Sequence, residues 1–303
     1  MIVRWGLDEL RPLLAELEIA NPFLVASGRW DALDLPAAAR WSEIPSDRIA
    51  VPEGTDGVLA VGGGSTIDTA KAASAATGLP LVSVPTTYSG AEWTVFFGVR
   101  RPDRTMAGGG AGANLAGVVY EPELTLDLPR PETGGTAMNA LAHCVEALYV
   151  GDLESARRGA ALIVEWLPRV LDDLHDLEAR TRLLEGACDA GAALAAHGLY
   201  LGHAMAQALG GRYGLPHGAL NAICLPAAMR FNADVAMLAL EIVPVETAEK
   251  LAHLAGFSQL RDLRVPEDEL DEVAEAVAVR PGARANPRPA SAEEIAGLLR
   301  SVW

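Results

Sequence analysis

Short apolar runs separated by glycine and proline characterise the first 130 residues. Three of these runs, at 23–26, 58–61 and 81–84, have the length and composition of buried strands. The stretch from Thr66 to about Thr77 has helical spacing and lies between the second and third runs. Two strands that flank a helix form a βαβ unit, which predicts a parallel sheet that binds ligands at the carboxyl ends of its strands.

The pattern changes at about residue 131, where strand-like runs stop and segments rich in alanine, leucine and glutamate follow. Residues 1–130 are therefore predicted to form an α/β domain and residues 131–303 an all-helical domain. Residues 280–290 are expected to be a proline-rich loop before the last helix. The helical segments are expected at 132–150, 153–174, 177–209, 218–230, 234–255, 266–278 and 291–301, with breaks at Gly210-Gly211, Pro216, Pro244 and Pro266.

Charge and composition exclude several functions. A formal net charge of -16 on 303 residues would repel a nucleic-acid backbone, although backbone N–H groups can still hold a small anionic cofactor. No stretch reaches the length of a membrane span, and the first residues lack the features of a secretory signal. The three cysteines, Cys144, Cys188 and Cys224, have no metal-binding spacing and apolar neighbours. We expect reduced thiols in a cytoplasmic protein.

A glycine triplet follows the second predicted strand. Gly62, Gly63 and Gly64 would let the backbone approach a pyrophosphate closely, and Ser65 could donate to a phosphate oxygen at the start of the helix. Asp68 lies on the first turns of the same helix. A tight turn without a ligand is the alternative for an isolated triplet, and the motif is neither G-x-G-x-x-G nor a Walker sequence.

A second polar segment, 85–92, follows the next strand. Thr86 and Thr87 suit contacts to the ribose or nicotinamide of a dinucleotide. The alternative is a capped turn, with Thr87 or Ser89 as the N-cap and Glu92 completing a capping box. Two such loops at neighbouring strand ends indicate one shared binding site.

Histidines mark the helical half of the chain. Asn139 and His143 are four residues apart and share a helix face, while His203 and His217 lie on later segments. These residues could form a metal pocket if the helices converge, and a core or surface role is the alternative for each one alone. The remaining histidines are expected to be structural or exposed: His175, His197 and His253.

Together these segments resemble the iron-containing (group III) alcohol dehydrogenases, and the maleylacetate reductases most of all. The resemblance implies a Rossmann-like dinucleotide-binding domain, here shortened, followed by a helical catalytic domain of the dehydroquinate synthase-like fold. It rests on VGGGSTIDTAKA (61–72), VPTTYSGAEWT (84–94), VVYEPELTLDLP (118–129), MNALAHCVEALY (138–149), GHAMAQALGGRYGLPHGALNAICLP (202–226) and NPRP (286–289).

The resemblance also implies site residues. The cofactor would be NAD(H) or NADP(H), and the catalytic residues would be His143, His203 and His217. Metal-dependent relatives have an Asp and three histidines as ligands. The positions that match them here are Asn139, His143, His203 and His217, and Gln207 replaces a further histidine of the family. The cofactor contacts would be Gly62, Gly63, Gly64, Ser65, Asp68, Thr86 and Thr87.

Asn139 is the main departure from the family pattern. A neutral amide in place of a carboxylate weakens the binding of a divalent ion such as Fe or Zn. Maleylacetate reductases are similar in having Asn at this position and working without metal. We therefore favour a metal-independent site in which an imidazolium polarises the carbonyl and supplies the proton.

The predicted function is reversible hydride transfer between a nicotinamide and a carbonyl, alcohol or unsaturated keto acid, in a cleft between the two domains.

The segment 28–57 shows no clear strand–helix unit, and Asp31 is the nearest candidate for the acid that selects NAD through the ribose. The shortened domain leaves open a peptide substrate, such as a threonine side chain, and a non-catalytic scaffold role. A homodimer is expected from the relatives.

Overall fold

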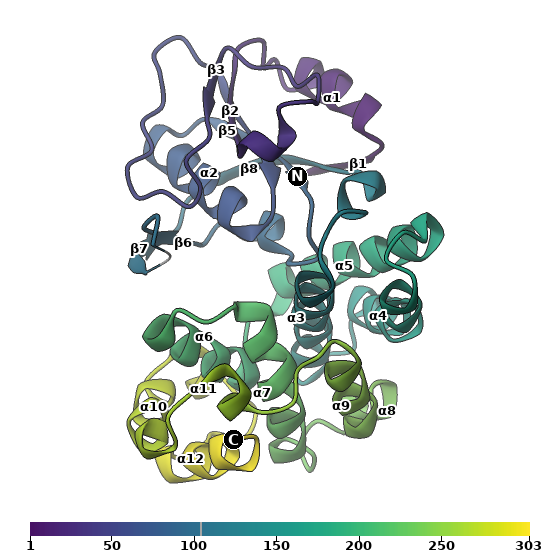
Figure 1. The fold of residues 1–303 in the computed structure, drawn as a ribbon, viewed down its shortest axis with the longest axis vertical. Helices are drawn as coiled ribbons and strands as arrows, with labels where there is room; N and C mark the ends of the chain where they lie inside the picture. Colours follow the sequence, from purple (N-terminus) through teal and green to yellow (C-terminus); the bar gives the residue numbers. More distant parts are fainter. Residues whose placement is uncertain (104) are drawn as a thin grey trace. The chain divides into compact units, whose positions relative to one another are not determined.

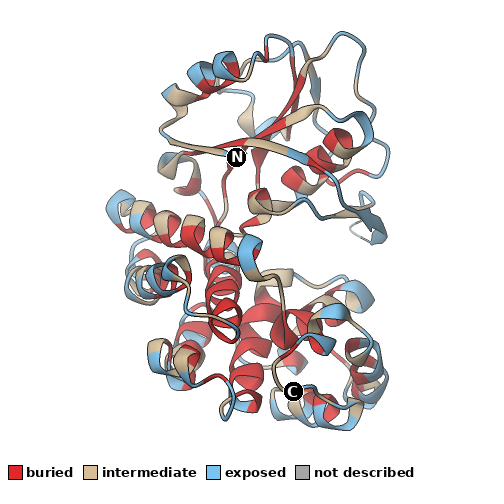
Figure 2. Ribbon diagram, turned by 180° about the vertical axis from the view of Figure 1, so that it is seen from behind, coloured by how far each residue is buried: buried red, intermediate tan, exposed pale blue. Residues whose placement is uncertain are grey.

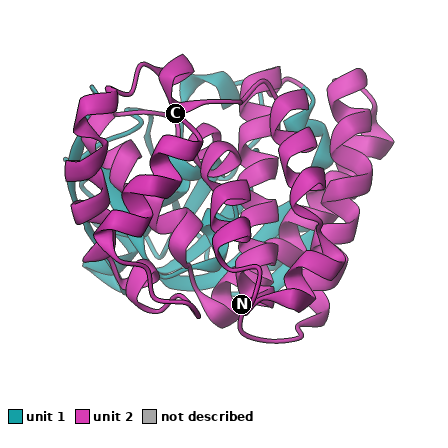
Figure 3. Ribbon diagram, turned by 90° about the horizontal axis from the view of Figure 1, so that it is seen from below, with its two compact units in different colours: residues 1–126 teal, residues 127–303 magenta. Residues whose placement is uncertain are grey.

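The computed structural model describes residues 1–103 and 105–303 (Figure 1). The chain divides into two compact units, Met1–Leu126 and Asp127–Trp303, which Figure 3 colours separately. The boundary lies four residues before the predicted one. Each unit is built around its own hydrophobic core, as their lengths allow.

The first unit contains a six-stranded sheet in which every neighbouring pair is parallel. Its order is β1 (Ile2–Trp5), β8 (Asn114–Tyr120), β5 (Pro80–Pro85), β4 (Gly57–Gly62), β2 (Pro22–Ala26) and β3 (Ala39–Trp41). The three predicted strands are the central β2, β4 and β5, which are almost entirely buried. Strands buried on both faces read as continuous apolar runs, which is why these three are the easiest to predict.

Alternate residues of the central strands enter two different cores. Leu24, Leu59 and Val82 pack with α1 (Leu10–Glu16), while Phe23 and Val58 pack with α2 (Gly64–Thr77) on the other face. The sheet is thus covered on both sides, as parallel sheets require. This arrangement leaves the carboxyl ends of the strands available for polar loops.

The other five strands of this unit were not predicted from the sequence. β1 and β8 are only partly buried, and β3 lies in the segment 28–57 that was expected to have no strand–helix unit. β6 (Phe97–Arg100) and β7 (Met106–Gly110) form a separate antiparallel pair, and β7 is glycine-rich and exposed throughout. Short 3-10 turns complete the unit at Leu7–Glu9, Gly28–Trp30, Ala91–Trp93 and Pro122–Thr125.

The second unit is helical. Its longest helices are α3 (Arg130–Leu148), α4 (Glu154–Asp172) and α5 (Leu177–His197), and on α3 the buried residues, red in Figure 2, run almost without interruption from Thr133 to Leu148. The others are α6 (Leu201–Tyr213), α7 (His217–Phe231), α8 (Met237–Ile242), α9 (Val245–Leu254), α10 (Leu270–Ala278), α11 (Pro281–Arg284) and α12 (Ala292–Ser301), with 3-10 turns at Leu260–Leu263 and Glu267–Glu269.

Two expectations about the helices were wrong. The segment 177–209 is not one helix, because Gly198 adopts a φ of +77° and ends α5 before α6 begins. The proline-rich loop 280–290 contains α11, which Pro281 starts at a position where its missing N–H costs nothing. The break expected at Pro244 separates α8 from α9.

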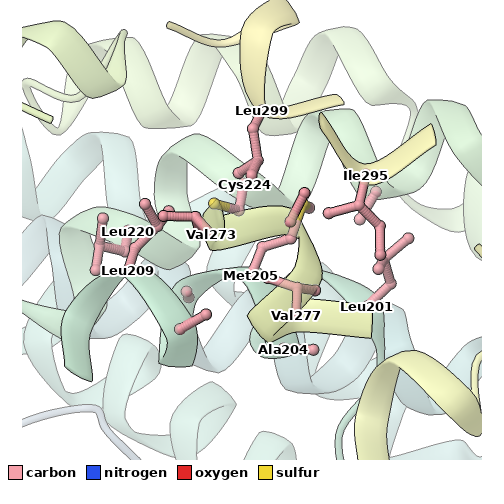
Figure 4. Close-up of a cluster of buried hydrophobic side chains, with 14 of the residues drawn as sticks. Leu201, Ala204, Met205, Leu209, Leu220, Cys224, Val273, Val277, Ile295 and Leu299 are labelled. Atoms are coloured by element: carbon pink, nitrogen blue, oxygen red, sulfur yellow. The ribbon is translucent and has the colours of Figure 1, made fainter. Parts of the chain in front are cut away.

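A core of leucine, isoleucine, valine and alanine side chains joins α6, α7, α10 and α12 (Figure 4). Leu201, Met205 and Leu209 on α6 meet Val273 and Val277 on α10 and Ile295 and Leu299 on α12. This packing fixes α6 and α7, the two helices that carry His203 and His217. Among the described residues, no helix has the length and apolar character needed to cross a membrane.

Candidate functional site

The glycine triplet ends β4 and begins α2, as predicted. Gly62 has a φ of +152°, and a Cβ atom there would lie 2.4 Å from Oγ1 of Thr66. A Cβ atom on Gly63 would lie 2.8 Å from Cγ2 of Thr87. No side chain caps α2, whose N-cap is Gly63. Bare backbone at the start of a 14-residue helix forms a cradle that fits a pyrophosphate.

The segment after β5 lies beside this cradle. β5 pairs with β4 so that Pro85 is opposite Gly62, and the Thr86 N–H donates to the Gly62 carbonyl at 3.1 Å. Oγ1 of Thr87 donates to Oγ of Ser89 at 3.3 Å. The sheet therefore brings Thr86 and Thr87 to the edge of the glycine loop, as expected from neighbouring strand ends.

The capping box considered for this segment is absent. The turn Ala91–Trp93 has Gly90 as its N-cap and no side-chain cap. Glu92 is buried instead and accepts a hydrogen bond from the Tyr120 hydroxyl at 2.7 Å. Burial raises the pKa of the Glu92 carboxyl.

Asp68 has structural partners on α2 and β6. Its Oδ2 accepts from the Gly98 N–H at 3.2 Å, and its Oδ1 lies 3.5 Å from Nζ of Lys71. Lys71 is almost completely buried and donates to the Phe96 carbonyl at 2.8 Å. Burial raises the pKa of Asp68 and lowers that of Lys71. The two residues thus attach β6 to α2, while Ser65 is exposed on the first turn.

The three histidines of the second unit converge. The rings of His143 and His203 stack with centroids 4.7 Å apart, and the His203 and His217 centroids are 5.9 Å apart. Nε2 of His203 lies 3.2 Å from Oδ1 of Asn139. The cluster therefore unites α3, α6 and α7, and its members, from Asn139 to His217, span almost 80 residues of the sequence.

Glu146 holds this cluster in place, and the sequence analysis did not single it out. Its Oε2 accepts from Nδ1 of His203 at 2.8 Å and from the Tyr200 N–H at 2.6 Å, and its Oε1 accepts from the His203 N–H at 3.1 Å. Both Glu146 and His203 are completely buried. One carboxylate thus caps the start of α6 and fixes the His203 ring. Its place one turn after His143 on α3 is the signal that could have identified it.

Asn139 has a further partner, the side-chain amide of Asn221, which the sequence analysis also missed. Asn221 on α7 donates from Nδ2 to Oδ1 of Asn139 at 2.5 Å. One helical turn earlier, Gly218 and Gly135 touch, and a Cβ atom on Gly218 would lie 2.5 Å from the Gly135 carbonyl carbon. These two glycines allow the close approach of α3 and α7 that brings the amides together.

The three histidines differ in burial. His143 is almost completely buried, and burial together with His203 and His217 holds its pKa well below the usual range. Its Nδ1 has no hydrogen-bond partner among the described residues. His143 is therefore neutral at neutral pH. His217, the first residue of α7, is only half-buried and is the most accessible of the three.

Acid is expected to destabilise the fold through His143. The unfolded chain takes up a proton as the pH falls below about 6.5, whereas folded His143 stays neutral to a much lower pH. The free energy of unfolding therefore decreases as the pH falls below about 6.5, by up to about 1.4 kcal/mol per pH unit. Urea unfolding at several pH values should show that acid lowers the free energy of unfolding less in His143→Phe than in the parent protein. An equal decrease in the variant and the parent would contradict this account.

Removal of the Glu146 carboxylate is expected to be strongly destabilising. Glu146→Leu leaves three buried donors without an acceptor, which should cost about 3 kcal/mol or more. Glu146→Gln keeps one acceptor oxygen and should lose less. Urea unfolding measures both free energies, and a Leu variant as stable as the parent would refute the role of Glu146 in capping α6.

A divalent metal does not fit these residues as they are arranged. An imidazole ligand holds an ion in the plane of its ring, and the planes of His143 and His203 are parallel within 11° and stacked. Oδ1 of Asn139 is already shared by Asn221 and His203. The described residues contain no group of three or more His, Cys, Asp or Glu side chains that could hold a metal ion.

Comparison with known proteins gives consistent matches over both units. The model of the Fe-containing alcohol dehydrogenase family, C-terminal, matches residues 133–303, and the model named iron-containing alcohol dehydrogenase matches residues 48–120. A maleylacetate reductase from Pseudomonas knackmussii is 35% identical over 270 residues, which cover 84% of this chain and 76% of that protein. Maleylacetate reductase 1 of Rhodococcus opacus is 32% identical over 98% of this chain and 84% of its own length.

Solved structures have the same fold. An iron-containing alcohol dehydrogenase from Corynebacterium glutamicum gives a TM-score of 0.87 at 27% identity, covering 100% of this chain and 94% of that one. A maleylacetate reductase from Agrobacterium tumefaciens gives 0.86 at 26% identity, covering 100% and 95%. The predicted fold class is confirmed, with a parallel sheet in the first unit and helices in the second.

Proposed function

Because the chain belongs to the iron-containing alcohol dehydrogenase family and is an NAD(P)-dependent oxidoreductase, we propose that it reduces an unsaturated keto acid of the maleylacetate type. The substrate class in this proposal is taken from the maleylacetate reductases to which the chain is similar. The convergence of His143, His203 and His217 beside a neutral amide, Asn139, is the structural observation that carries the proposal.

In this proposal the first unit binds the nucleotide. The glycine cradle and the start of α2 hold the pyrophosphate, and Thr86 and Thr87 orient the nicotinamide half. Ser65, exposed on the first turn of α2, adds a hydroxyl donor. The bound nicotinamide supplies the hydride in reduction or accepts it in oxidation.

The helical unit would stabilise the negative charge that develops on the substrate carbonyl oxygen. His143 is neutral and enclosed, and Glu146 and Asn139 occupy the ring nitrogens of His203. His217, the accessible member, is therefore the group that we assign to the substrate oxygen, where it donates a proton. His203 and Asn139 are held in place by hydrogen bonds and form the rigid part of the cluster next to His217.

The test is a titration of metal-stripped full-length protein with NADH and NADPH, followed by fluorescence. Assays of maleylacetate reduction follow, before and after addition of Fe(II) or Zn(II). Nucleotide binding and turnover without metal are expected. Turnover only with metal would overturn the metal-independent site, and turnover only with a secondary alcohol or a threonine-containing peptide would overturn the keto-acid assignment. Lack of binding to either nucleotide would reject the proposed cofactor site.

A further inference from the structure

Lysine is rare in this chain, and one of its lysines is buried. Of the 24 lysines and arginines, only Lys71 on α2 and Lys250 on α9 are lysines. Lys250 is exposed, whereas the side chain of Lys71 is only 1% exposed. Because removing an ammonium group from water costs free energy, its place inside the first unit requires specific partners. The nucleotide contacts proposed above do not include Lys71.

The ammonium group of Lys71 meets three oxygen acceptors. Nζ lies 3.5 Å from Oδ1 of Asp68 on the same helix. It also donates to Oγ1 of Thr94 at 3.1 Å and to the Phe96 carbonyl at 2.8 Å. An ammonium has three donors on one compact atom, so these acceptors use all of them, whereas a guanidinium is a larger planar group. The arrangement is therefore specific for lysine in a chain that otherwise uses arginine.

Two of the three acceptors lie just after the segment 85–92, which we call the nicotinamide loop. The loop begins beside the glycine cradle, where the Thr86 N–H donates to the Gly62 carbonyl at 3.1 Å. Residues 94–98 follow the loop, are held by Lys71, and lead into β6 beside α2 (Figure 1). The two ends of the nicotinamide loop are therefore attached to β4 and α2, the two elements that form the cradle.

Glu92 adds a buried carboxyl group at the end of the nicotinamide loop. Its Oε1 accepts from the Tyr120 hydroxyl at 2.7 Å, and Nε1 of Trp93 donates to the same hydroxyl at 2.8 Å. Burial raises the pKa of Glu92, and the nearby Lys71 ammonium opposes this rise. A buried polar network of this kind stabilises one arrangement of the segments that it connects.

We propose that Lys71 is a positioning residue for hydride transfer, because it fixes the nicotinamide loop relative to the glycine cradle. This inference rests on the proposed function. In it, Lys71 acts through the loop and makes no contact with the cofactor. The cradle holds the pyrophosphate whether or not Lys71 is present, whereas the placement of the nicotinamide ring depends on the loop. Loss of Lys71 should therefore affect one half of the dinucleotide and leave the other unchanged.

Isothermal titration calorimetry of the full-length protein separates the two halves. NADH is compared with ADP-ribose, and NADPH with 2′-phospho-ADP-ribose, because each pair differs only by the nicotinamide. In Lys71→Met we expect the Kd of the ADP-ribose fragment to stay within about twofold and that of the dinucleotide to rise about tenfold. The kcat should fall about 100-fold, since a displacement of about 1 Å is enough to misplace the reacting atoms.

Further variants separate charge from geometry. Lys71→Arg keeps the charge but not the compact group, and it should not restore the nicotinamide contribution. Thr94→Val removes one acceptor without leaving a buried charge unpaired, so it should fold as the parent does and weaken dinucleotide binding about threefold. Lys250→Met is the matched control on the exposed face of α9 and should leave both Kd values and kcat unchanged.

Two results would overturn the inference. One is an unchanged ratio of dinucleotide to fragment affinity in both Lys71→Met and Thr94→Val, and Thr94→Val decides alone if Lys71→Met does not fold. The other is an equal loss of both affinities, which would mean that Lys71 only supports the fold of the first unit. In either case the proposed function would stand, because the parent still binds a nucleotide. If the parent binds neither dinucleotide nor fragment, the proposed function fails together with this inference.

Discussion

Replacement of His217 by asparagine is expected to lower kcat by about 10²–10⁴-fold, the contribution of a positioned general acid. His217 is the accessible histidine of the cluster, whereas His143 is neutral and Glu146 and Asn139 engage the ring nitrogens of His203. Asparagine can still donate a hydrogen bond but cannot transfer a proton. The nucleotide Kd should stay within about twofold, because the glycine cradle belongs to the other unit.

Steady-state rates and nucleotide titrations on the same preparation separate the two parameters. His253→Asn is the control, since His253 is exposed on α9 and takes no part in the cluster. A His217→Asn variant that retains the kcat of the parent would remove His217 from the mechanism. A variant that has lost nucleotide affinity as well would show a wider structural change.

Replacement of Gly63 by valine is expected to weaken NADPH and NADH binding by about 100-fold or more, because it blocks the backbone approach that a pyrophosphate requires. A Cβ atom at this position already lies 2.8 Å from Cγ2 of Thr87, and the two γ-methyl groups of valine would extend further around the cradle. Gly63→Ala should have a smaller effect, because only the Thr87 side chain has to move. The same fluorescence titration measures both variants.

Gly297→Ala is the matched control for the loss of a glycine. An added Cβ atom there meets nothing within 4 Å, and the position lies inside helix α12, where alanine is favoured. This variant should bind both nucleotides as the parent does. Full affinity in Gly63→Val would mean that the dinucleotide does not lie on this loop.

The parts of the fold that can be predicted from the sequence are those whose pattern is local. The fully buried β2, β4 and β5 appear as uninterrupted apolar runs, and proline at residue 244 marks a helix end. Three of the five residues of β7 are glycine, so its side chains form no recognisable pattern. The three-residue β3 is too short to recognise, since only its pairing with β2 defines it.

The candidate site, like the fold, could be predicted from the sequence only in part. The glycine loop and the histidines have residue types that indicate chemistry wherever they lie. Glu146 and Asn221 do not, because their roles depend on partners 57 and 82 residues away in the chain, His203 and Asn139. A glutamate or an asparagine on a helix is expected to face solvent until the packing of that helix is known. Long-range packing is therefore what assigns them to the site.

The contact between Gly135 and Gly218 limits the substitutions that this protein can accept during evolution. A Cβ atom on Gly218 would lie 2.5 Å from the Gly135 carbonyl carbon, and one on Gly135 would lie 3.3 Å from the Gly218 carbonyl carbon. Either side chain would push α3 away from α7, more strongly at Gly218, and would move the amides of Asn139 and Asn221 one turn away. Neither glycine is expected to touch a substrate, yet both should be as intolerant of replacement as the residues that do. In a library of random variants selected for growth on the substrate, the surviving clones should keep glycine at both positions, or change both helices together. The geometry of the proposed site thus depends on two residues that carry no functional group.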